Sequence, residues 1–245
     1  IARAVSDIAA MGGEPRWALI DLVAPAATPV ARIRQLYAGM IAAAKKWNLS
    51  ILGGDTAEGD TLELHIFGVG LIPRGRAVLR AGARPGDRLY VTGALGGAYL
   101  PGSRHHLLFE PRLAAGQFLA RSGFATAMMD LSDGLAADLP RLLEASRCGV
   151  QLNAAAIPIT RAARRTAHPL QHAMGDGEDF ELLFTVPAAK QARFATAWAK
   201  QFPRLRATCI GEILANPRRR VIRLPDGRLQ PLRAGGYQHF LPLQG

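Results

Sequence analysis

The sequence is poor in cysteine and contains no long apolar run. Cys148 and Cys209 are the only cysteines among 245 residues, and two isolated thiols can form neither a disulfide framework nor a four-thiolate zinc site. No stretch of eighteen apolar residues is present, so no membrane-spanning helix is expected. The first residues also lack the charged, apolar and cleavage regions of a secretory signal peptide. These absences predict a protein of a reducing compartment, the cytoplasm, without a membrane partner.

Acidic residues are also scarce. The chain has 19 Asp and Glu against 30 Lys and Arg, which gives a net charge of +11. Such a charge is compatible with binding of nucleic acid or of anionic substrates. The basic residues are spread along the chain, and no strand combines aromatic and basic residues as RNA-binding sheets do. A non-catalytic nucleic-acid-binding module stays open as an alternative, although the charge alone is weak evidence for it.

Hydrophobic residues, 49% of the chain, occur both in short apolar runs and at helical spacing. The runs predict strands over 16–23, 127–131 and 181–186, and the helical spacing predicts helices over 29–47 and 188–202. This alternation indicates an α/β or α+β fold. The basic segment 74–87, punctuated by Gly and Pro, predicts a boundary between an N-terminal domain, residues 1–87, and a C-terminal domain, residues 88–245.

A predicted strand, a sharp turn and a helix follow one another around Asp130. The apolar run 127–131 ends in a turn that contains Asp130, Ser132 and Asp133, and a four-residue apolar repeat begins directly afterwards. Oxygen ligands packed at such a turn suit a hard cation such as Mg²⁺, which carries phosphates. Alternatively, Ser132 or Asp133 only caps the helix. Pro140 is expected to kink or restart that helix.

Other acidic residues occur where a predicted strand meets glycine or other small residues. Besides those around Asp130, they are Asp7, Asp55, Glu178, Asp179 and Glu181. Glycine beside a carboxylate lets a bulky ligand approach the backbone. Carboxylates between apolar runs are costly unless a cation binds there. The pattern as a whole favours a site for metal and phosphate over helix capping.

The chain lacks the established phosphate-binding loop Gly-x4-Gly-Lys-Ser/Thr. Segment 93–97, which contains three glycines, follows a predicted strand, and its amides could hold a phosphate; a plain turn explains it as well. No spacing of Ser, Cys, His and Asp indicates a nucleophile with its base. His105 and His106 are adjacent in a predicted loop and point apart, so a metal shared between them is not expected.

Eight short motifs follow one another from one end of the chain to the other. They are Ser6-Asp7-Ile8-Ala9-Ala10-Met11-Gly12-Gly13-x-Pro15, Gly53-Gly54-Asp55-Thr56, Gly75-Arg76-Ala77-x-x-Arg80-x-Gly82-Ala83-x-Pro85-Gly86-Asp87, Val91-Thr92-Gly93, Glu110-Pro111-Arg112, Asp130-Leu131-Ser132-Asp133-Gly134-Leu135, Gly177-Glu178-Asp179-Phe180-Glu181-Leu182 and Gly236-Tyr237-x-His239-Phe240. Any one of them is a weak signal, whereas eight in order are a strong one. With these motifs the chain resembles the thiamine-monophosphate kinases, which belong to the superfamily that includes aminoimidazole ribonucleotide synthetase. The motifs at 177–182 and 236–240 distinguish this family from its superfamily relatives.

The resemblance implies a two-domain fold of that superfamily, with N-terminal domains paired in a homodimer. It also implies an enzyme that uses ATP and Mg²⁺ to phosphorylate thiamine monophosphate to thiamine diphosphate. The acceptor of such a reaction is a phosphate oxygen that is already ionised near neutral pH. The enzyme therefore has to position two anions and neutralise their charge, and no general base is needed.

Matched motif by motif, the resemblance also implies roles for individual residues. The metal-binding carboxylates would be Asp7, Asp55, Asp130 and Asp133, with Asp130 and Asp133 central to catalysis. Asp55, Arg80 and Ser132 would lie on the ATP side, and Glu178 and Tyr237 on the thiamine side. Apart from the resemblance, Arg80 is explained equally well as a solvated loop residue and Tyr237 as ordinary packing.

The chain departs from the family pattern at several positions. The family's N-terminal segment with a Gly-Asp-Asp-Ala motif, a source of further metal ligands, does not occur in this sequence, so we expect an incomplete N-terminal domain. Segment 97–108 is short, Asp176 stands where the family usually has Gly, and Phe180 where it usually has Tyr. A superfamily relative acting on another small substrate is the main rival, and the motif at 177–182 argues against it.

Overall fold

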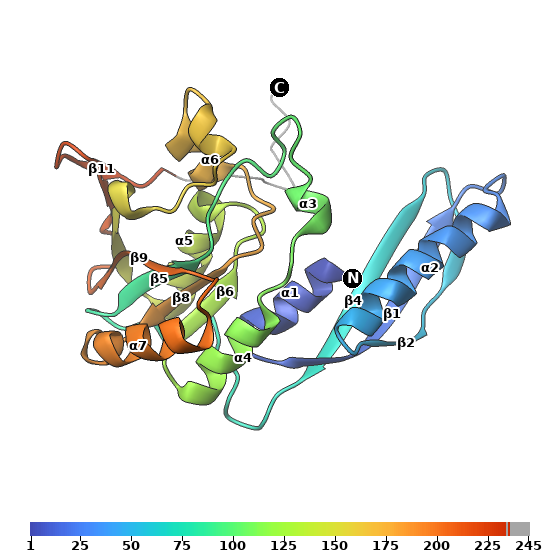
Figure 1. Cartoon of the computed structure of the whole chain (residues 1–245), viewed down its shortest axis with the longest axis horizontal. Helices are drawn as coiled ribbons and strands as arrows, with labels where there is room; N and C mark the ends of the chain where they lie inside the picture. Colours follow the sequence, from blue (N-terminus) through green and yellow to red (C-terminus); the bar gives the residue numbers. More distant parts are fainter. Residues whose placement is uncertain (234, 236–245) are drawn as a thin grey trace.

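Two β-sheets of unequal size organise the chain (Figure 1). The computed structural model describes residues 1–233 and 235. The smaller, four-stranded sheet is built around β1 (Glu14–Ala24), which pairs in parallel with β2 (Ser50–Gly53) and β3 (Thr56–Glu58). Along its other edge β1 pairs antiparallel with β4 (Glu63–Leu71) over nearly its whole length.

The two faces of this small sheet differ in what covers them. Ala18 of β1 is buried in one cluster with Ala44 of α2 (Val30–Lys46), which lies across the sheet (Figure 1). Residues that alternate with Ala18 along β1 point the other way, because successive side chains of a strand lie on opposite faces. We call this opposite side the apolar outer face; its exposed members are Trp17, Leu19, Phe67 and Val69.

The larger sheet has seven strands in the order β11-β10-β7-β9-β5-β8-β6. The strands are β5 (Arg88–Thr92), β6 (Ala127–Asp130), β7 (Gly149–Asn153), β8 (Leu182–Val186), β9 (Ala207–Leu214), β10 (Arg220–Arg223) and β11 (Leu229–Pro231). One face is covered by α4 (Leu113–Ser122) and α7 (Gln191–Gln201), and the other by α5 (Leu135–Ser146) and α6 (Pro169–Gly175) (Figure 1). Short 3₁₀ helices span Ala154–Ala156, Ala163–Arg165 and Ala188–Lys190.

Alternation along the central strands gives this sheet a core on each face. Phe184 of β8 packs among the aromatic side chains Phe194 and Trp198 of α7. Its neighbour Leu183 belongs to the other core, together with Leu139 of α5. Burial on both faces explains why this strand is apolar in the sequence at every position except Thr185. The mixed helix-and-sheet architecture predicted from the sequence is confirmed.

Helix α1 (Ala2–Ala10) lies between the two sheets (Figure 1) and packs closely against elements of both. A Cβ atom on Gly116 of α4 would lie only 2.0 Å from the backbone oxygen of Ala9, and one on Gly68 of β4 would lie 3.1 Å from the Cβ of Ala4. Glycine on both neighbours therefore allows α1 to approach them. Helix α1 therefore packs against both the small sheet and helix α4 of the larger sheet.

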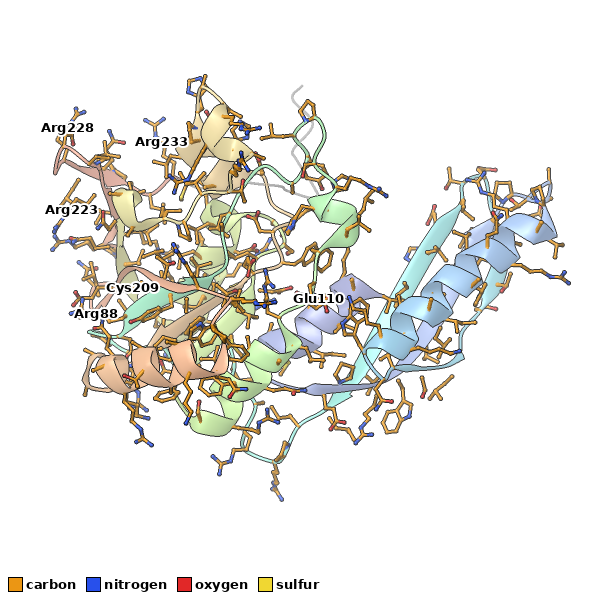
Figure 2. All side chains as sticks on the ribbon, in the orientation of Figure 1. Arg88, Glu110, Cys209, Arg223, Arg228 and Arg233 are labelled. Atoms are coloured by element: carbon orange, nitrogen blue, oxygen red, sulfur yellow. The ribbon has the colours of Figure 1, made fainter. Side chains whose placement is uncertain are left out.

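Glu110 makes a second link between the two parts (Figure 2). Its carboxylate accepts a hydrogen bond from the indole Nε1 of Trp47 at 3.3 Å and pairs with the ammonium group of Lys46 at the end of α2. Residues 72–87, which connect β4 to β5, contain no helix or strand. A domain boundary at residue 87 remains a prediction.

Two local predictions need correction. The helix does not restart at Pro140, because the proline removes only one backbone hydrogen bond while the neighbouring leucines Leu139 and Leu142 are fully buried; a kink at Pro140 stays a prediction. His105 and His106 lie in a one-turn helix, α3 (His105–Leu108), rather than in a loop. Among the residues that the structure describes, no helix is both long and apolar enough to cross a membrane.

Candidate functional site

A cavity of about 480 Å³ opens where α1, the β6–α5 turn and the segment before β8 meet. Four residues predicted for the site line it, namely Asp7, Asp130, Ser132 and Asp133, together with the predicted substrate residue Glu178. The remaining lining residues are Arg3, Tyr99, Asp176 and Phe180. We call this cavity the acidic pocket. Motifs from three distant parts of the chain therefore meet in one place.

A second cavity of about 410 Å³, here the apolar pocket, adjoins it. Its walls are mostly hydrophobic and come from the end of α1, residues 78–81 and β6; they include Ala10, Met11, Val78, Leu79, Ala81, Met128 and Met129. Arg80 is its cationic lining residue, and Asp7 and Asp130 line this cavity as well as the acidic pocket. The two carboxylates thus stand at the boundary between an apolar and an acidic chamber.

Asp130 ends β6 and is 6% exposed. The hydroxyl of Ser6 donates a hydrogen bond to its Oδ2 at 2.5 Å, so α1 is fixed directly to the end of this strand. Burial, and to a smaller extent the charge of Asp7, raise the pKa of Asp130 to about 6, although the Ser6 hydrogen bond opposes this. A carboxylate that is buried beside another one is a group that a bound cation would stabilise.

Asp7 follows Ser6 on the same helix. Burial raises the pKa of its carboxyl group, and the nearby charge of Arg80 partly offsets this effect. Within the described part of the chain, no hydrogen bond or ion pair engages the Asp7 carboxylate. Its oxygens are therefore available to a ligand in either cavity.

Asp133 is held by two residues that the sequence motifs did not single out. Arg141 Nη1 donates to Asp133 Oδ2 and to Asp138 Oδ1, both at 2.6 Å. Asp138 Oδ2 in turn accepts the backbone N–H of Asp133 at 2.9 Å. Burial raises the pKa of Asp138, which is 1% exposed, to about 6. A carboxylate on the buried face of α5 was the only signal in the sequence that could have indicated this support.

The segment that carries Glu178 is held in an uncommon backbone conformation. Glu178 and Phe180 have φ values of 57° and 49°, which L-residues rarely adopt. Backbone hydrogen bonds hold the segment against the Asp130 turn, from Glu178 N to Ser132 O at 2.7 Å and from Phe180 N to Leu131 O at 2.8 Å. Strain of this kind persists only where the surroundings determine it, and it clusters at functional sites.

The glycine-rich segment 93–97 serves as structure rather than as a phosphate loop. Gly96 N donates to Asp179 Oδ1 at 2.8 Å, and Gly97 N donates to Asp176 Oδ2 at 2.7 Å. Gly93 N donates to a backbone oxygen at 2.9 Å. Because these amides are already engaged, the interpretation as a turn holds. The turn fixes the segment that presents Glu178.

Asp179 itself is buried behind the acidic pocket. Burial, followed by the charges of Glu181 and Asp176, raises its pKa to about 8. Its Oδ2 is buried and has no hydrogen-bond partner among the described residues. A proton on this carboxyl group therefore accounts for its burial better than a charge does.

The structure does not bring every predicted site residue to the pockets. Asp55 is exposed between β2 and β3 of the small sheet, where its Oδ1 accepts the backbone N–H of Thr56 at 2.8 Å, and it lines neither pocket. Tyr237 lies outside the described residues. Within 1–233 and 235, no three Asp, Glu, His or Cys side chains are grouped closely enough to hold a metal ion on their own.

Family models match most of the chain. The model of the AIR synthase related protein, N-terminal domain, covers residues 1–72, and that of the AIR synthase related protein, C-terminal domain, covers residues 84–223. The predicted two-domain fold of this superfamily is thereby confirmed.

Among the individual proteins most similar to the chain are thiamine-monophosphate kinases. The chain is 41% identical to the thiamine-monophosphate kinase of Rhodopirellula baltica over 196 residues, which are 77% of this chain and 60% of that protein. It is 34% identical to the Escherichia coli thiamine-monophosphate kinase over 260 residues, with 96% of this chain and 77% of that protein covered. The solved structure of AaThiL complexed with AMPPCP and TMP matches with a TM-score of 0.79 at 28% identity, covering 96% of this chain and 77% of that one.

Proposed function

The chain belongs to the AIR synthase related family and, within it, to the thiamine-monophosphate kinases, and we propose that the complete protein transfers the γ-phosphoryl group of ATP to thiamine monophosphate. The chain covers 60% of the first relative's length and 77% of the second's, so the proposal concerns the whole protein that contains this chain. The structure of AaThiL is of its complex with AMPPCP and TMP, which supports the same pair of ligands here.

The observation that carries the proposal is that Asp7 and Asp130 line both pockets. The apolar pocket, with Arg80 at its rim, suits the base and phosphates of ATP. The acidic pocket suits thiamine monophosphate, because carboxylates and the aromatic ring of Phe180 are favourable surroundings for a cationic thiazolium ring. Donor and acceptor phosphates would then meet beside Asp7 and Asp130.

Direct transfer requires little covalent chemistry from the protein. The acceptor oxygen is already ionised, and what remains is to hold two phosphates in line and to balance their charge. In this scheme Ser6 orients Asp130, Arg141 and Asp138 orient Asp133, and the fixed segment 177–180 presents Glu178.

Asp7 and Asp130 also fit Mg²⁺. This ion is usually held by one or two carboxylates together with substrate phosphates and water, rather than by a cage made only of protein side chains. Burial raises the pKa of Asp130 to about 6, so its charged form is costly inside the protein, and a cation bound beside it would lower that cost. When bound, Mg²⁺ would neutralise negative charge on the phosphates. Asp133 is proposed as a further ligand, and Ser132 as a contact on the nucleotide side. The motif match also proposes Asp55, but its position outside both pockets does not support that role.

We further propose a homodimer in which a second copy covers the apolar outer face. Its member Phe67 is 57% exposed, and contiguous apolar surfaces of this kind mark interaction sites. Analytical ultracentrifugation should show a dimer for the wild-type protein and a monomer for Phe67→Glu. Leu229→Glu, at an apolar residue of β11 that is 45% exposed, is the matched control and should leave the dimer intact.

A cytoplasmic location is proposed as well, since both cysteines are free and ATP is available there. The kinase function is tested by incubating the complete protein with Mg²⁺, ATP and thiamine monophosphate and measuring thiamine diphosphate by chromatography. We expect stoichiometric formation of thiamine diphosphate and ADP. ATP consumption only with another small acceptor, such as an aminoimidazole ribonucleotide, would replace the proposal by a superfamily relative of different substrate.

A further inference from the structure

Arg3 belongs to the acidic pocket although no sequence motif pointed to it. It precedes Asp7 by four residues on α1, so both side chains lie on one face of the helix. Its Nη2 donates to Glu178 Oε2 at 2.6 Å, and its guanidinium carbon lies 5.9 Å from the ring centre of Phe180. Arg3 therefore links the helix that carries Asp7 to the strained segment that carries Glu178.

The charges of the pocket's lining residues favour a role for this arginine. Its described lining residues include five carboxylates, those of Asp7, Asp130, Asp133, Asp176 and Glu178, and Arg3 is the one Arg or Lys among them. The phosphate of thiamine monophosphate is an anion and would be repelled by such a wall. A guanidinium at the pocket offers planar paired donors that match a phosphate group.

The positive charge of Arg3 and the negative charge of Glu178 also complement the two charges of the substrate. Thiamine monophosphate carries a cationic thiazolium ring and an anionic phosphate in one molecule. Arg3 could donate to the phosphate while the Glu178 carboxylate faces the ring, so that two new ion pairs replace one. The Arg3 side chain is 64% exposed, and the pair itself contributes little to stability, so that exchanging it costs little.

We propose that Arg3 binds the phosphate of the acceptor, exchanging Glu178 for it when thiamine monophosphate enters. The inference rests on the proposed function and makes Arg3 a determinant of specificity for the phosphorylated substrate. The guanidinium carries five N–H donors, and one of them, on Nη2, is bonded to Glu178, so Arg3 can begin to engage the phosphate before that bond breaks.

Steady-state kinetics of the complete protein test this exchange. For Arg3→Gln we expect the KM for thiamine monophosphate to rise about tenfold, which is the loss expected for one charged contact. The KM for ATP should stay within about twofold of the wild-type value. Arg3→Lys should recover part of the loss, because an ammonium keeps the charge and loses the planar fork.

The matched control is Arg228→Gln. Arg228 is also an exposed arginine paired with a carboxylate, that of Asp226, and lies at the β10–β11 hairpin away from α1 (Figure 2). This variant should leave both KM values unchanged.

Thiamine without phosphate separates binding of the phosphate from a merely structural role. As a competitive inhibitor, thiamine should bind Arg3→Gln and wild-type protein about equally well, because it has a neutral hydroxyl group in place of the phosphate that Arg3 would pair with. Equal weakening of thiamine and of its monophosphate, or an unchanged KM for the monophosphate, would overturn the proposal for Arg3. A wild-type protein that forms no thiamine diphosphate at all would instead overturn the proposed function, and this inference with it.

Discussion

Replacing Arg112 by methionine should destabilise the protein strongly, because it leaves a buried carboxylate without its counter-charge. The side chain of Glu181 is 3% exposed. Arg112 donates to it through Nε at 2.7 Å and through Nη2 at 2.5 Å, and the hydroxyl of Thr92 donates at 2.6 Å. In Arg112→Met the neutral Thr92 hydroxyl is the one side-chain donor to Glu181 that remains among the described residues.

The size of the loss follows from the cost of burying an unpaired charge. Removing one partner of a buried ion pair costs about 3–5 kcal/mol, a large fraction of the roughly 5–15 kcal/mol that stabilise a protein domain. For a chain of this length, that loss lowers Tm by roughly 6–20 °C. Urea unfolding followed by circular dichroism measures the difference directly.

Two comparisons identify the cause. The double variant Arg112→Met/Glu181→Met should be more stable than Arg112→Met alone, because it removes the stranded charge together with its partner. Arg228→Met, which breaks the exposed pair with Asp226, should cost less than about 1 kcal/mol. If Arg112→Met unfolds within about 1 kcal/mol of the wild type, or the double variant is no more stable, the reasoning about this buried pair is refuted.

Three further variants test the buried acid and the packing of α1. The native protein keeps a proton on Asp179 up to about pH 8, whereas the unfolded chain releases it near pH 4. The protonated Asp179 therefore contributes fully to stability below about pH 4, and this contribution is lost as the pH rises to 8. The free energy of unfolding of Asp179→Asn relative to the wild type should increase over that range by up to ~1.4 kcal/mol per pH unit. A difference between the two proteins that does not change with pH would contradict this. Gly116→Ala should cost about 1–3 kcal/mol or more, since its Cβ would lie 2.0 Å from the Ala9 oxygen, whereas Gly39→Ala on α2, with nothing within 4 Å, should stabilise by about 0.5–1 kcal/mol. Equal unfolding midpoints for these two alanine variants would show that α1 does not pack on α4 as described.

The sequence predicted the site best where polar side chains directly follow an apolar run. An apolar run that ends in two carboxylates and a hydroxyl predicted both β6 and the place of Asp130, because a buried strand has to end where polar groups begin. The strand before Asp55 was predicted by a similar pattern, a short apolar run that ends in two glycines and a carboxylate. A strand end, however, does not reveal which sheet contains the strand, and β2 belongs to the small sheet, so Asp55 lies away from the pockets.

Contacts between distant residues escaped prediction for a different reason. Arg3 reaches Glu178 across 175 positions of sequence, and only the packing of α1 between the two sheets brings them together. Segment 93–97 looked able to bind phosphate because its glycines follow a predicted strand and leave backbone amides accessible. In the structure, the carboxylates of Asp176 and Asp179, from far along the chain, accept hydrogen bonds from these amides. A sequence pattern can identify hydrogen-bond donors, but only the folded structure shows which acceptors they contact.

The most direct test of the account compares thiamine diphosphate formation by the wild-type protein and by Asp130→Asn, with Mg²⁺, ATP and thiamine monophosphate all saturating. The substitution keeps the shape of the side chain and removes its charge, and Asp226→Asn in the exposed β10–β11 hairpin serves as control. If Asp130 stands between donor and acceptor phosphates, kcat should fall at least about 100-fold while the melting temperature is retained, and the control should be fully active. A folded Asp130→Asn protein that turns over at the wild-type rate would contradict the assignment of the site.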